Sequence, residues 1–401
     1  MYFNYNKTSV FVFMVVYLCI INIGFYIGSK GKIIEVVNSK NKFQYIYSIL
    51  SYSLFIAVFL QIVNFAFLVS EGKISLDLSS LGSNYVSYYE NYNEKKDVES
   101  FSRDFNFLLI SSVPKFISLC LGLFYFKILK RKEKIKLILL IMLILLNDTI
   151  AKGNQKSIGD IVIFGLLAFV VNVDFEKYKK KLYYVSLLTG ILLLFFMGYS
   201  QYSRYTSRDL DIKDINQNVY EYASFDLEHP MFKVFGDKIG FGISFFVTSY
   251  LSDGYYGLSK CLELDFEWTY GFGNSLALQA TYDKVTGENI YNQTYLGRME
   301  KEYNIQGKAQ WHTIFPWLAS DITFVGALLI FFPISYIYGK SWKEAIIYKN
   351  PVSYIMVCLL TVMFVFVPAN NQILSGIDYF VITNVLFLFW LFNHKKYNFK
   401  Y

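Results

Sequence analysis

Proline, cysteine and histidine are scarce in this chain: its 401 residues include six Pro, four Cys and three His. Cys19, Cys120 and Cys358 lie in apolar runs and Cys261 stands alone, so the pattern excludes a secreted disulfide scaffold. No cluster of His and Cys has the spacing of zinc ligands. We therefore predict no metal site and no cofactor.

Apolar sequence, by contrast, is abundant: 54% of the residues are hydrophobic and 17% are charged. A helix needs about 20 apolar residues to cross a bilayer, and most of the apolar runs approach that length. We predict an all-α polytopic membrane protein with about nine transmembrane helices, within a range of about eight to eleven. The runs are 9–28, 43–69, 107–129, 137–150, 158–173, 182–199, 318–338, 351–368 and 375–392.

Lysine-rich loops alternate with loops that are not basic. Short loops that carry positive charge stay in the cytoplasm. The basic segments are 30–42, 130–136, 177–181, 340–349 and 395–400. We predict that these segments are cytoplasmic, and that the N-terminus and the two long loops lie outside.

This topology divides the chain into three regions. We predict a six-helix transmembrane region at 1–199 with an outer loop at 70–106, a large extracytoplasmic loop at 200–316 and a three-helix transmembrane region at 317–401. Both long loops are net acidic although the whole chain has a formal charge of +7. The basic balance therefore reflects membrane topology and not binding to nucleic acid.

Two short motifs in the large loop resemble known sites and are rejected. Gly271-Phe-Gly-Asn-Ser-Leu276 begins like a dinucleotide fingerprint, but it lacks the third glycine and follows no strand of a βαβ unit. Asp209-Leu-Asp211 has the form of an acidic pair that holds a metal with a nucleotide sugar. Nucleotide sugars are not expected on the outer face, so we do not assign a metal there.

Polar side chains within the apolar runs share one depth. Charges inside a membrane are costly and usually serve function, although each of these residues could simply pair with a neighbour. We predict a polar cavity that opens toward the outer leaflet. The residues predicted in the outer half are Gln61, Asn64, Lys115, Asp148, Asp160, Asp321 and Asp378.

Cations gather near the same level. Lys152 and Lys156 lie in a tight outer turn, and Arg204 and Arg208 lie just above the sixth apolar run. Cationic side chains, and arginine forks especially, suit a phosphate or pyrophosphate that a lipid tail anchors at the interface. We predict that these four residues bind pyrophosphate, with a solvated or structural role for the two arginines as the alternative.

Aromatic residues and glycine mark the second half of the large loop. The run 239–250 is too short to span a membrane, which favours a re-entrant or interfacial helix that ends at the turn Ser252-Asp-Gly254. Flat aromatic faces suit stacking on sugar rings, and they equally suit packing at a headgroup boundary. The residues that we predict to contact glycan are Tyr255, Tyr256, Trp268, Tyr270 and Trp311.

His312 and Asp321 flank the start of the seventh apolar run. Asp321 lies in a predicted helix, Trp317-Leu-Ala-Ser-Asp-Ile-Thr-Phe-Val-Gly326. A lone histidine is more often structural than catalytic. His312 nevertheless lies beside the Asp321 carboxylate at the predicted cavity mouth. Either His312 or Asp321 is therefore a candidate for the catalytic base or for the group that orients the acceptor.

Several segments resemble one family. Tyr250-Leu-Ser-Asp-Gly-Tyr-Tyr-Gly-Leu-Ser259, Trp268-Thr-Tyr-Gly-Phe-Gly-Asn274 and Trp311-His-Thr313 with Trp317-Leu-Ala-Ser-Asp-Ile-Thr-Phe324 look like the oligosaccharide repeat-unit polymerases of bacterial surface polysaccharides (Wzy type). The turn Lys152-Gly-Asn-Gln-Lys156 resembles the outer basic turn of that family, where arginine is commoner at the last position. The specific motifs lie within 250–326.

The resemblance implies a membrane glycosyltransferase of the bacterial cytoplasmic membrane. Such an enzyme would polymerise repeat units linked to undecaprenyl pyrophosphate into a capsule or O-antigen polysaccharide. Its partners would be a lipid-linked oligosaccharide donor and acceptor, membrane lipid, and a chain-length regulator and flippase of the same pathway. No nucleic acid is expected.

Two alternatives stay open from the sequence. A ligase of similar architecture, like an O-antigen ligase, would move finished glycan to another acceptor. A flippase or exporter of lipid-linked oligosaccharides would be expected to have more evenly spaced spans, internal symmetry and no large outer loop.

Overall fold

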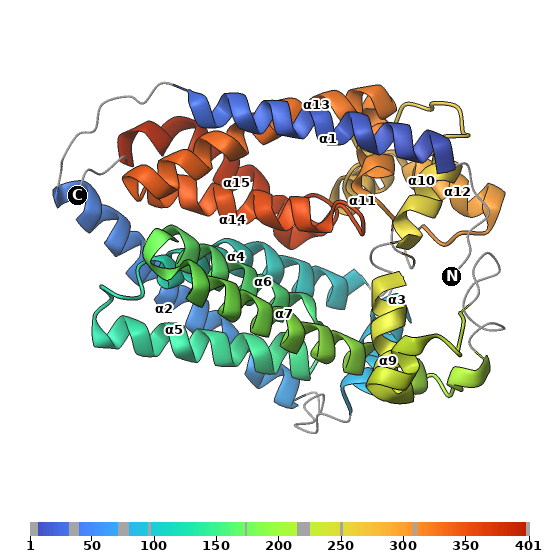
Figure 1. Ribbon diagram of the computed structural model, residues 1–401, viewed down its shortest axis with the longest axis horizontal. Coiled ribbons are helices and arrows are strands. Elements are labelled where there is room, and N and C mark those ends of the chain that lie inside the picture. The colour runs from blue at the N-terminus through green and yellow to red at the C-terminus, as the bar shows by residue number, and fades with distance from the viewer. Residues whose placement is uncertain are drawn as a thin grey trace. The chain divides into compact units, whose positions relative to one another are not determined.

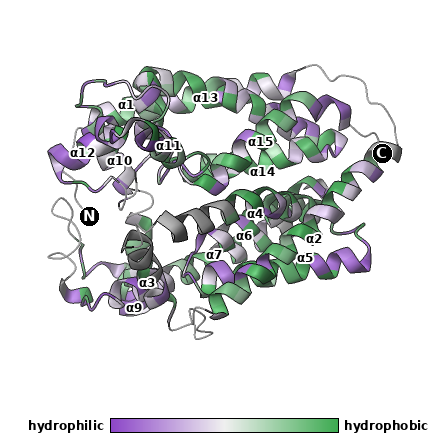
Figure 2. Cartoon of the chain, turned by 180° about the vertical axis from the view of Figure 1, so that it is seen from behind, coloured by the Kyte–Doolittle hydropathy of each residue, from purple (hydrophilic) through white to green (hydrophobic). Residues whose placement is uncertain are grey.

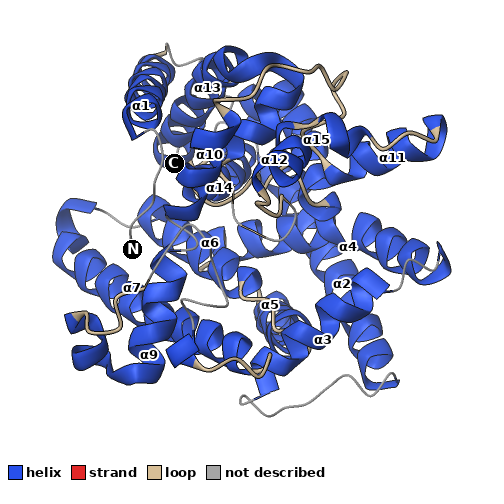
Figure 3. Ribbon diagram, turned by 90° about the vertical axis from the view of Figure 1, so that its right-hand side faces the viewer, coloured by secondary structure: helices blue, strands red, loops and turns tan. Residues whose placement is uncertain are grey.

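The computed structural model describes residues 7–31, 40–70, 80–94, 98–172, 175–214, 225–248, 252–307, 310 and 312–397. Throughout these residues every regular element is a helix and no strand occurs. Figure 3 shows helices joined by loops. The prediction of an all-α chain is confirmed.

The helices form two compact units. Unit 1 comprises Met1–Phe3 and Gln44–Thr248, and unit 2 comprises Asn4–Phe43 and Ser249–Tyr401. The predicted regions group residues by their order along the chain, whereas these units group them by packing. The first helix packs with the C-terminal helices, and the large loop is shared between the two units.

Unit 1 is a set of long helices with shorter ones at one end (Figure 1). The π-helix η2 continues directly from α5 and carries Asp148. Its elements are α2 (Lys40–Ser70), α3 (Leu81–Glu94), α4 (Val98–Phe124), α5 (Arg131–Ile144), η2 (Leu145–Ile150), α6 (Lys156–Asn172), α7 (Phe175–Thr206), η3 (Ile212–Asp214) and α9 (Pro230–Thr248).

Contacts in unit 1 bring the segments predicted to lie outside to the same end. The Gly82 amide donates to Ser203 Oγ at 3.0 Å, and Asn84 Nδ2 donates to the Ile150 carbonyl at 2.9 Å. At the opposite end, the Lys130 amide donates to the Tyr47 hydroxyl at 3.2 Å. The long helices therefore run up and down between two ends, as the alternation of basic loops predicts.

Helix α9 begins earlier than the predicted short apolar helix 239–250 and covers its residues 239–248, whereas Ser249 and Tyr250 lie outside the described residues. Its first part is set apart by Gly236, whose φ of 74° is a left-handed conformation that favours glycine. Gly242 lies against the backbone of Gly198 on α7, where any side chain would clash. The predicted turn at Ser252-Asp-Gly254 is wrong: Ser252 and Asp253 form a helical turn that leads into α10.

Unit 2 combines the first helix with the C-terminal half of the chain. Helix α1 lies along α13, and Gly24, Gly28 and Gly339 let their backbones approach closely (Figure 1). The elements are α1 (Lys7–Lys30), α10 (Gly254–Cys261), α11 (Leu276–Thr286), η5 (Ile290–Gln293), α12 (Tyr295–Tyr303), α13 (Ile314–Tyr348), α14 (Pro351–Phe366), α15 (Ile377–Asn393) and η6 (His394–Tyr397).

Helix α13 is broken immediately after Asp321. Ile322 has φ −132°, and Thr323 has φ 64° and ψ 166°, so neither residue is helical. The second part of the helix begins with the Thr323 hydroxyl accepting from the Gly326 amide at 3.2 Å, which caps it. The prediction of a continuous helix from Trp317 to Gly326 is therefore wrong, and the sequence pattern missed the break because the apolar periodicity continues through it.

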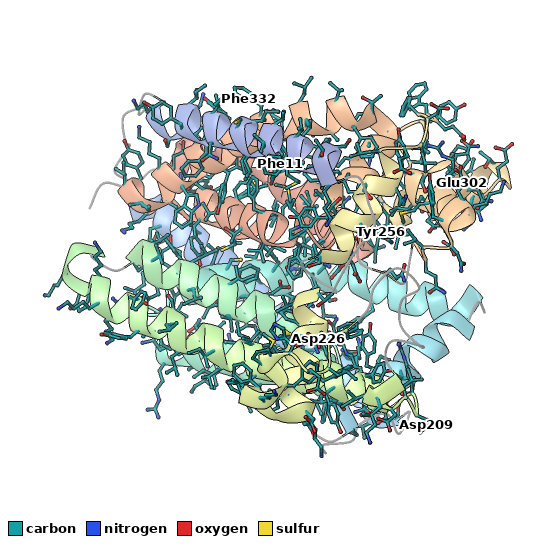
Figure 4. All side chains as sticks on the ribbon, turned by 45° about the vertical axis from the view of Figure 1, so that its right-hand side comes forward. Phe11, Asp209, Asp226, Tyr256, Glu302 and Phe332 are labelled. Carbon is teal, nitrogen blue, oxygen red and sulfur yellow. The ribbon has the colours of Figure 1, made fainter. Side chains whose placement is uncertain are left out.

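The long helices are apolar enough to cross a membrane. Figure 2 shows hydrophobic colour along their length, and exposed side chains such as Phe11 on α1 and Phe332 on α13 project outward in Figure 4 (69% and 40% exposed). These helices indicate a membrane-embedded protein. The segments that are long and apolar enough to span are Lys7–Lys30, Phe43–Ser70, Lys177–Thr206, Ile314–Tyr348 and Ile377–Tyr397.

The remaining predicted spans also form helices, but shorter ones. Leu109–Phe124 and Pro351–Phe366 are apolar helices below the length that identifies a span, and the run 137–150 is divided between α5 and η2. The count of about nine transmembrane helices therefore stays a prediction.

Candidate functional site

An ion cluster centred on Asp148 lies at the end of unit 1 that is predicted to be outside. The Lys115 ammonium lies 3.5 Å from one carboxylate oxygen of Asp148, and the Lys152 ammonium lies 3.8 Å from the other. The Ser157 hydroxyl donates to the same carboxylate at 3.0 Å. Residues of three helical segments, α4, η2 and α6, thus meet in this cluster. Lys115 and Asp148, which the sequence predicts at the same depth, are in contact there.

Arg204 is held beside this cluster, at the end of α7. Its guanidinium donates from Nη2 to the Gly153 carbonyl at 2.6 Å and lies 3.6 Å from the centroid of the Tyr85 ring. The side chain is only 9% exposed. A cation over an aromatic face is favourable, so the outer turn and α3 together fix the orientation of Arg204.

Lys156 and Arg208, the other two residues predicted to bind pyrophosphate, differ in their exposure to solvent. Lys156 begins α6, and its ammonium lies 3.6 Å from Asp160. Arg208 is exposed, beyond the end of α7. The structure therefore brings Lys152, Lys156 and Arg204 together at one end of unit 1, whereas Arg208 projects into solvent.

The described part of this cluster carries more positive than negative charge. Lys115, Lys152, Lys156 and Arg204 stand against the two carboxylates of Asp148 and Asp160. Partly buried cations that gather at one place attract an anion, and they do so more strongly than they would in bulk water. The cluster has the chemistry of a phosphate-binding site.

Asp321 in unit 2 is surrounded by neutral donors. One carboxylate oxygen accepts from the Thr269 hydroxyl at 2.5 Å and the Gly273 amide at 3.0 Å. The other accepts from the Asn274 amide at 3.0 Å and from its side-chain nitrogen at 2.6 Å. Asp321 therefore fastens the loop Trp268–Asn274 to the broken end of the first part of α13.

His312 lies in the core of unit 2 and is 3% exposed. Its Nε2 lies 3.1 Å from the Gln306 carbonyl, and Nδ1 faces the Cα of Gly257. Burial lowers the pKa of His312 to about 4, despite the opposing hydrogen bond to Gln306. The ring is therefore neutral at neutral pH and a weak proton acceptor.

The fastened loop displays two aromatic side chains. Trp268 is 57% exposed and Tyr270 is 55% exposed, and their ring centroids lie 4.9 Å apart. Tyr270 has φ 56°, an uncommon conformation for a residue other than glycine. The loop is thus held in an unusual shape that presents both rings to the outside of unit 2.

The other residues predicted to contact glycan are less accessible. Tyr256, which Figure 4 labels on α10, is buried, and Tyr255 is half-buried. Burial raises the pKa of both hydroxyls. Trp311 lies outside the described residues. Trp268 and Tyr270 are therefore the strongest glycan-binding candidates in this set.

Several residues that shape these sites escaped prediction from sequence. Tyr85 comes from α3 and Thr269 and Asn274 from the aromatic loop. The pairing of Arg204 with Tyr85 has no local signal, because the residues are far apart in sequence. Asn274 belongs to a glycine-rich motif, and a turn-forming asparagine in such a motif was the available clue.

Throughout the described residues, no group of three or more His, Cys, Asp and Glu side chains is placed to hold a metal ion. Comparison with family models, curated proteins and solved structures gives no significant match for this chain. The function is therefore argued from the geometry above.

Proposed function

We propose that the protein is a membrane glycosyltransferase that polymerises oligosaccharide repeat units linked to undecaprenyl pyrophosphate at the outer face of the bacterial cytoplasmic membrane. The observation that carries this proposal is the gathering of Lys115, Lys152, Lys156 and Arg204 near Asp148, at the end of unit 1 that is predicted to face outward. The aromatic loop of unit 2 supports it, because aromatic faces suit sugar rings.

The chemistry needs an anion site more than a metal. The bond between the anomeric carbon and a phosphate oxygen breaks, and pyrophosphate leaves with the electron pair. An acceptor hydroxyl forms the new bond to the anomeric carbon and loses its proton. Lys152, Lys156 and Arg204 stabilise the charge that develops on the leaving group, as donors aimed at a developing oxyanion do.

The transfer also needs a proton acceptor for the hydroxyl group. His312 and Asp321 were the candidates from sequence, and each has a structural task here. Asp321 accepts four hydrogen bonds from its own loop, and His312 is buried and neutral. Both base assignments stay predictions, tested by comparing glycosidic transfer with protein stability in Asp321→Asn and His312→Gln.

The proposal is tested by comparing two arginines that lie one turn apart. Arg204→Ala removes a buried cation from the cluster and is expected to lower polymer formation by about 10- to 100-fold. Arg208→Ala removes an exposed charge and should leave at least half of the activity. The measurement is chain formation by purified protein in liposomes that contain lipid-linked repeat units.

The product distinguishes the proposal from its rivals. Longer lipid-linked glycan supports a polymerase. Transfer to a different acceptor would indicate a ligase, and translocation with no new glycosidic bond would indicate a flippase. Equal loss in both arginine variants would remove the cluster from the mechanism, as would full activity in Arg204→Ala.

A further inference from the structure

Gln155 is a buried side chain whose polar atoms have no protein partner among the described residues. It is 5% exposed, and neither its amide nitrogen nor its amide oxygen makes a hydrogen bond there. A buried amide without a partner loses its hydration without compensation, and such groups in folded proteins call for an explanation. The expected explanation is structural water, stored strain or a ligand.

The surroundings of Gln155 favour a ligand. The residue lies in the outer turn between Gly153, whose carbonyl accepts from Arg204, and Lys156. Arg204 Nε and the hydroxyl of Thr149, which are also buried, likewise lack a hydrogen-bond partner in the described part of the chain. Three donors without a partner among the described residues therefore belong to the segments that surround the cations of this cluster.

The backbone at this place is unusual as well. Thr149 belongs to the π-helix η2, which ends at Ile150, two residues before Lys152. Single π-helical turns are frequent at functional sites. The unpartnered donors thus come from a segment whose geometry departs from the ordinary helix.

We infer that Gln155 is an uncharged ligand of the diphosphate group, donating from its amide nitrogen to a phosphoryl oxygen while the lysines and Arg204 supply charge. The inference rests on the proposed function, because that function supplies the diphosphate. It adds a directional donor that net charge alone does not provide, and it explains why a buried amide is left without a protein partner.

The test compares two buried glutamines. Gln155→Leu removes the unpartnered amide, so the ligand-free protein should unfold at a higher temperature while binding weakens by about tenfold or more. Gln279, in unit 2, donates to the Gly273 carbonyl at 2.8 Å and is 3% exposed. Gln279→Leu should lower the unfolding temperature and leave diphosphate affinity unchanged.

Binding is measured by calorimetry on the full-length protein in detergent, with inorganic pyrophosphate and with farnesyl pyrophosphate as separate probes. Binding of farnesyl pyrophosphate alone would identify a lipid-linked diphosphate, and equal binding of both would identify the diphosphate group itself as the determinant. Gln155→Met is the second variant, because methionine keeps the unbranched shape of glutamine whereas leucine is branched.

The outcomes separate the inference from the function that it rests on. If Arg204→Ala loses diphosphate affinity while Gln155→Leu and Gln155→Met keep it, the amide is structural and only the inference fails. If the parent protein binds neither probe, the anion site of the proposed function fails too. A lower unfolding temperature of the ligand-free Gln155→Leu and Gln155→Met variants would also overturn the inference, since it would show that the amide has a protein partner.

Discussion

Two buried aspartates, one in each unit, are stabilised in opposite ways. Asp148 in unit 1 is held by the charges of Lys115 and Lys152 and by one hydroxyl. Asp321 in unit 2 is held by two backbone amides, one hydroxyl and one side-chain amide, all neutral. Each is less than 10% exposed.

The difference separates a site for charge from a structural anchor. If the carboxylate of Asp148 is removed, its counter-ions keep their positive charge and can bind another anion in its place. The neutral donors around Asp321 belong to one folded loop and match one carboxylate. A buried acid is therefore a poor indicator of catalysis by itself, and the kind of partner that surrounds it is more informative.

The largest effect is expected from Asp321→Ala. This change leaves four donors of the aromatic loop without their acceptor, and hydrogen bonds to a charged group contribute about 1.5–3 kcal/mol each. We expect the free energy of unfolding to fall by about 3 kcal/mol or more, measured by thermal unfolding in detergent. Asp265→Ala, at an exposed acid, should change it by no more than about 0.5 kcal/mol.

A stable Asp321→Ala variant that has lost only activity would break the comparison, because it would make Asp321 a catalytic group and not an anchor. Limited proteolysis within 268–274 gives a second measurement. The loop should become susceptible to cleavage in Asp321→Ala and remain protected in Asp265→Ala.

The next effect concerns pH. Burial lowers the pKa of His312 from its ordinary value of 6.5 to about 4, so the ring is neutral in the folded protein at neutral pH. As the pH falls below 6.5, His312 gains a proton in the unfolded chain but stays neutral in the folded protein until about pH 4. The contribution of His312 to the free energy of unfolding is therefore full above pH 6.5 and is lost as the pH falls toward 4. The loss should reach about 3 kcal/mol.

The measurement is thermal unfolding from pH 4.5 to 7.5 for the parent and for His312→Gln. The difference between the two curves isolates His312, since other titrating groups contribute to both. Identical slopes would show that His312 is accessible to protons in the folded state. His229→Gln, at an exposed histidine, should follow the parent curve.

The smallest effect is expected from Asp148→Asn, and it sharpens the comparison. Because Lys115 and Lys152 are about one fifth exposed, losing their counter-ion should cost about 1 kcal/mol. An added anion should restore this loss by occupying the place of the carboxylate. Unfolding is measured with and without millimolar pyrophosphate, and Asp321→Asn should show no such rescue.

Rescue of both variants would mean that the anion stabilises the protein at a site other than the Asp148 cluster. Absence of rescue in Asp148→Asn, with a normal response in the parent, would mean that the lysines serve only their carboxylate. Either result would remove the distinction between the two aspartates.

The framework was predictable because hydropathy follows local sequence. Each predicted apolar run is helical over most of its length. The segments that carry the basic loops also meet, as in the contact of Lys343 with the Gly31 carbonyl. The pairing of α1 with α13 was not predictable. It depends on Gly28 meeting the backbone of Tyr336, a long-range fit that composition does not reveal.

The site was predictable in chemistry more than in geometry. Lys152, Lys156 and Arg204 were identified from residue type and position, but sequence could not tell buried Arg204 from exposed Arg208. Asp321 and His312 were identified as candidate bases because titratable residues at the edge of an apolar run often serve function. Their hydrogen-bond partners, which define their roles, come from distant loops.

The break in α13 links protein geometry to bilayer thickness. From Phe324 to Tyr348 the helix is about 37 Å long, at 1.5 Å per residue, and a hydrocarbon core is about 30 Å thick. On the predicted topology, helix tilt takes up the excess length and the break falls at the headgroup level. Lipid chain length then sets the depth at which Trp268 and Tyr270 meet the interface. A thicker or thinner membrane therefore changes the distance of these two side chains from the bilayer without any change of residue.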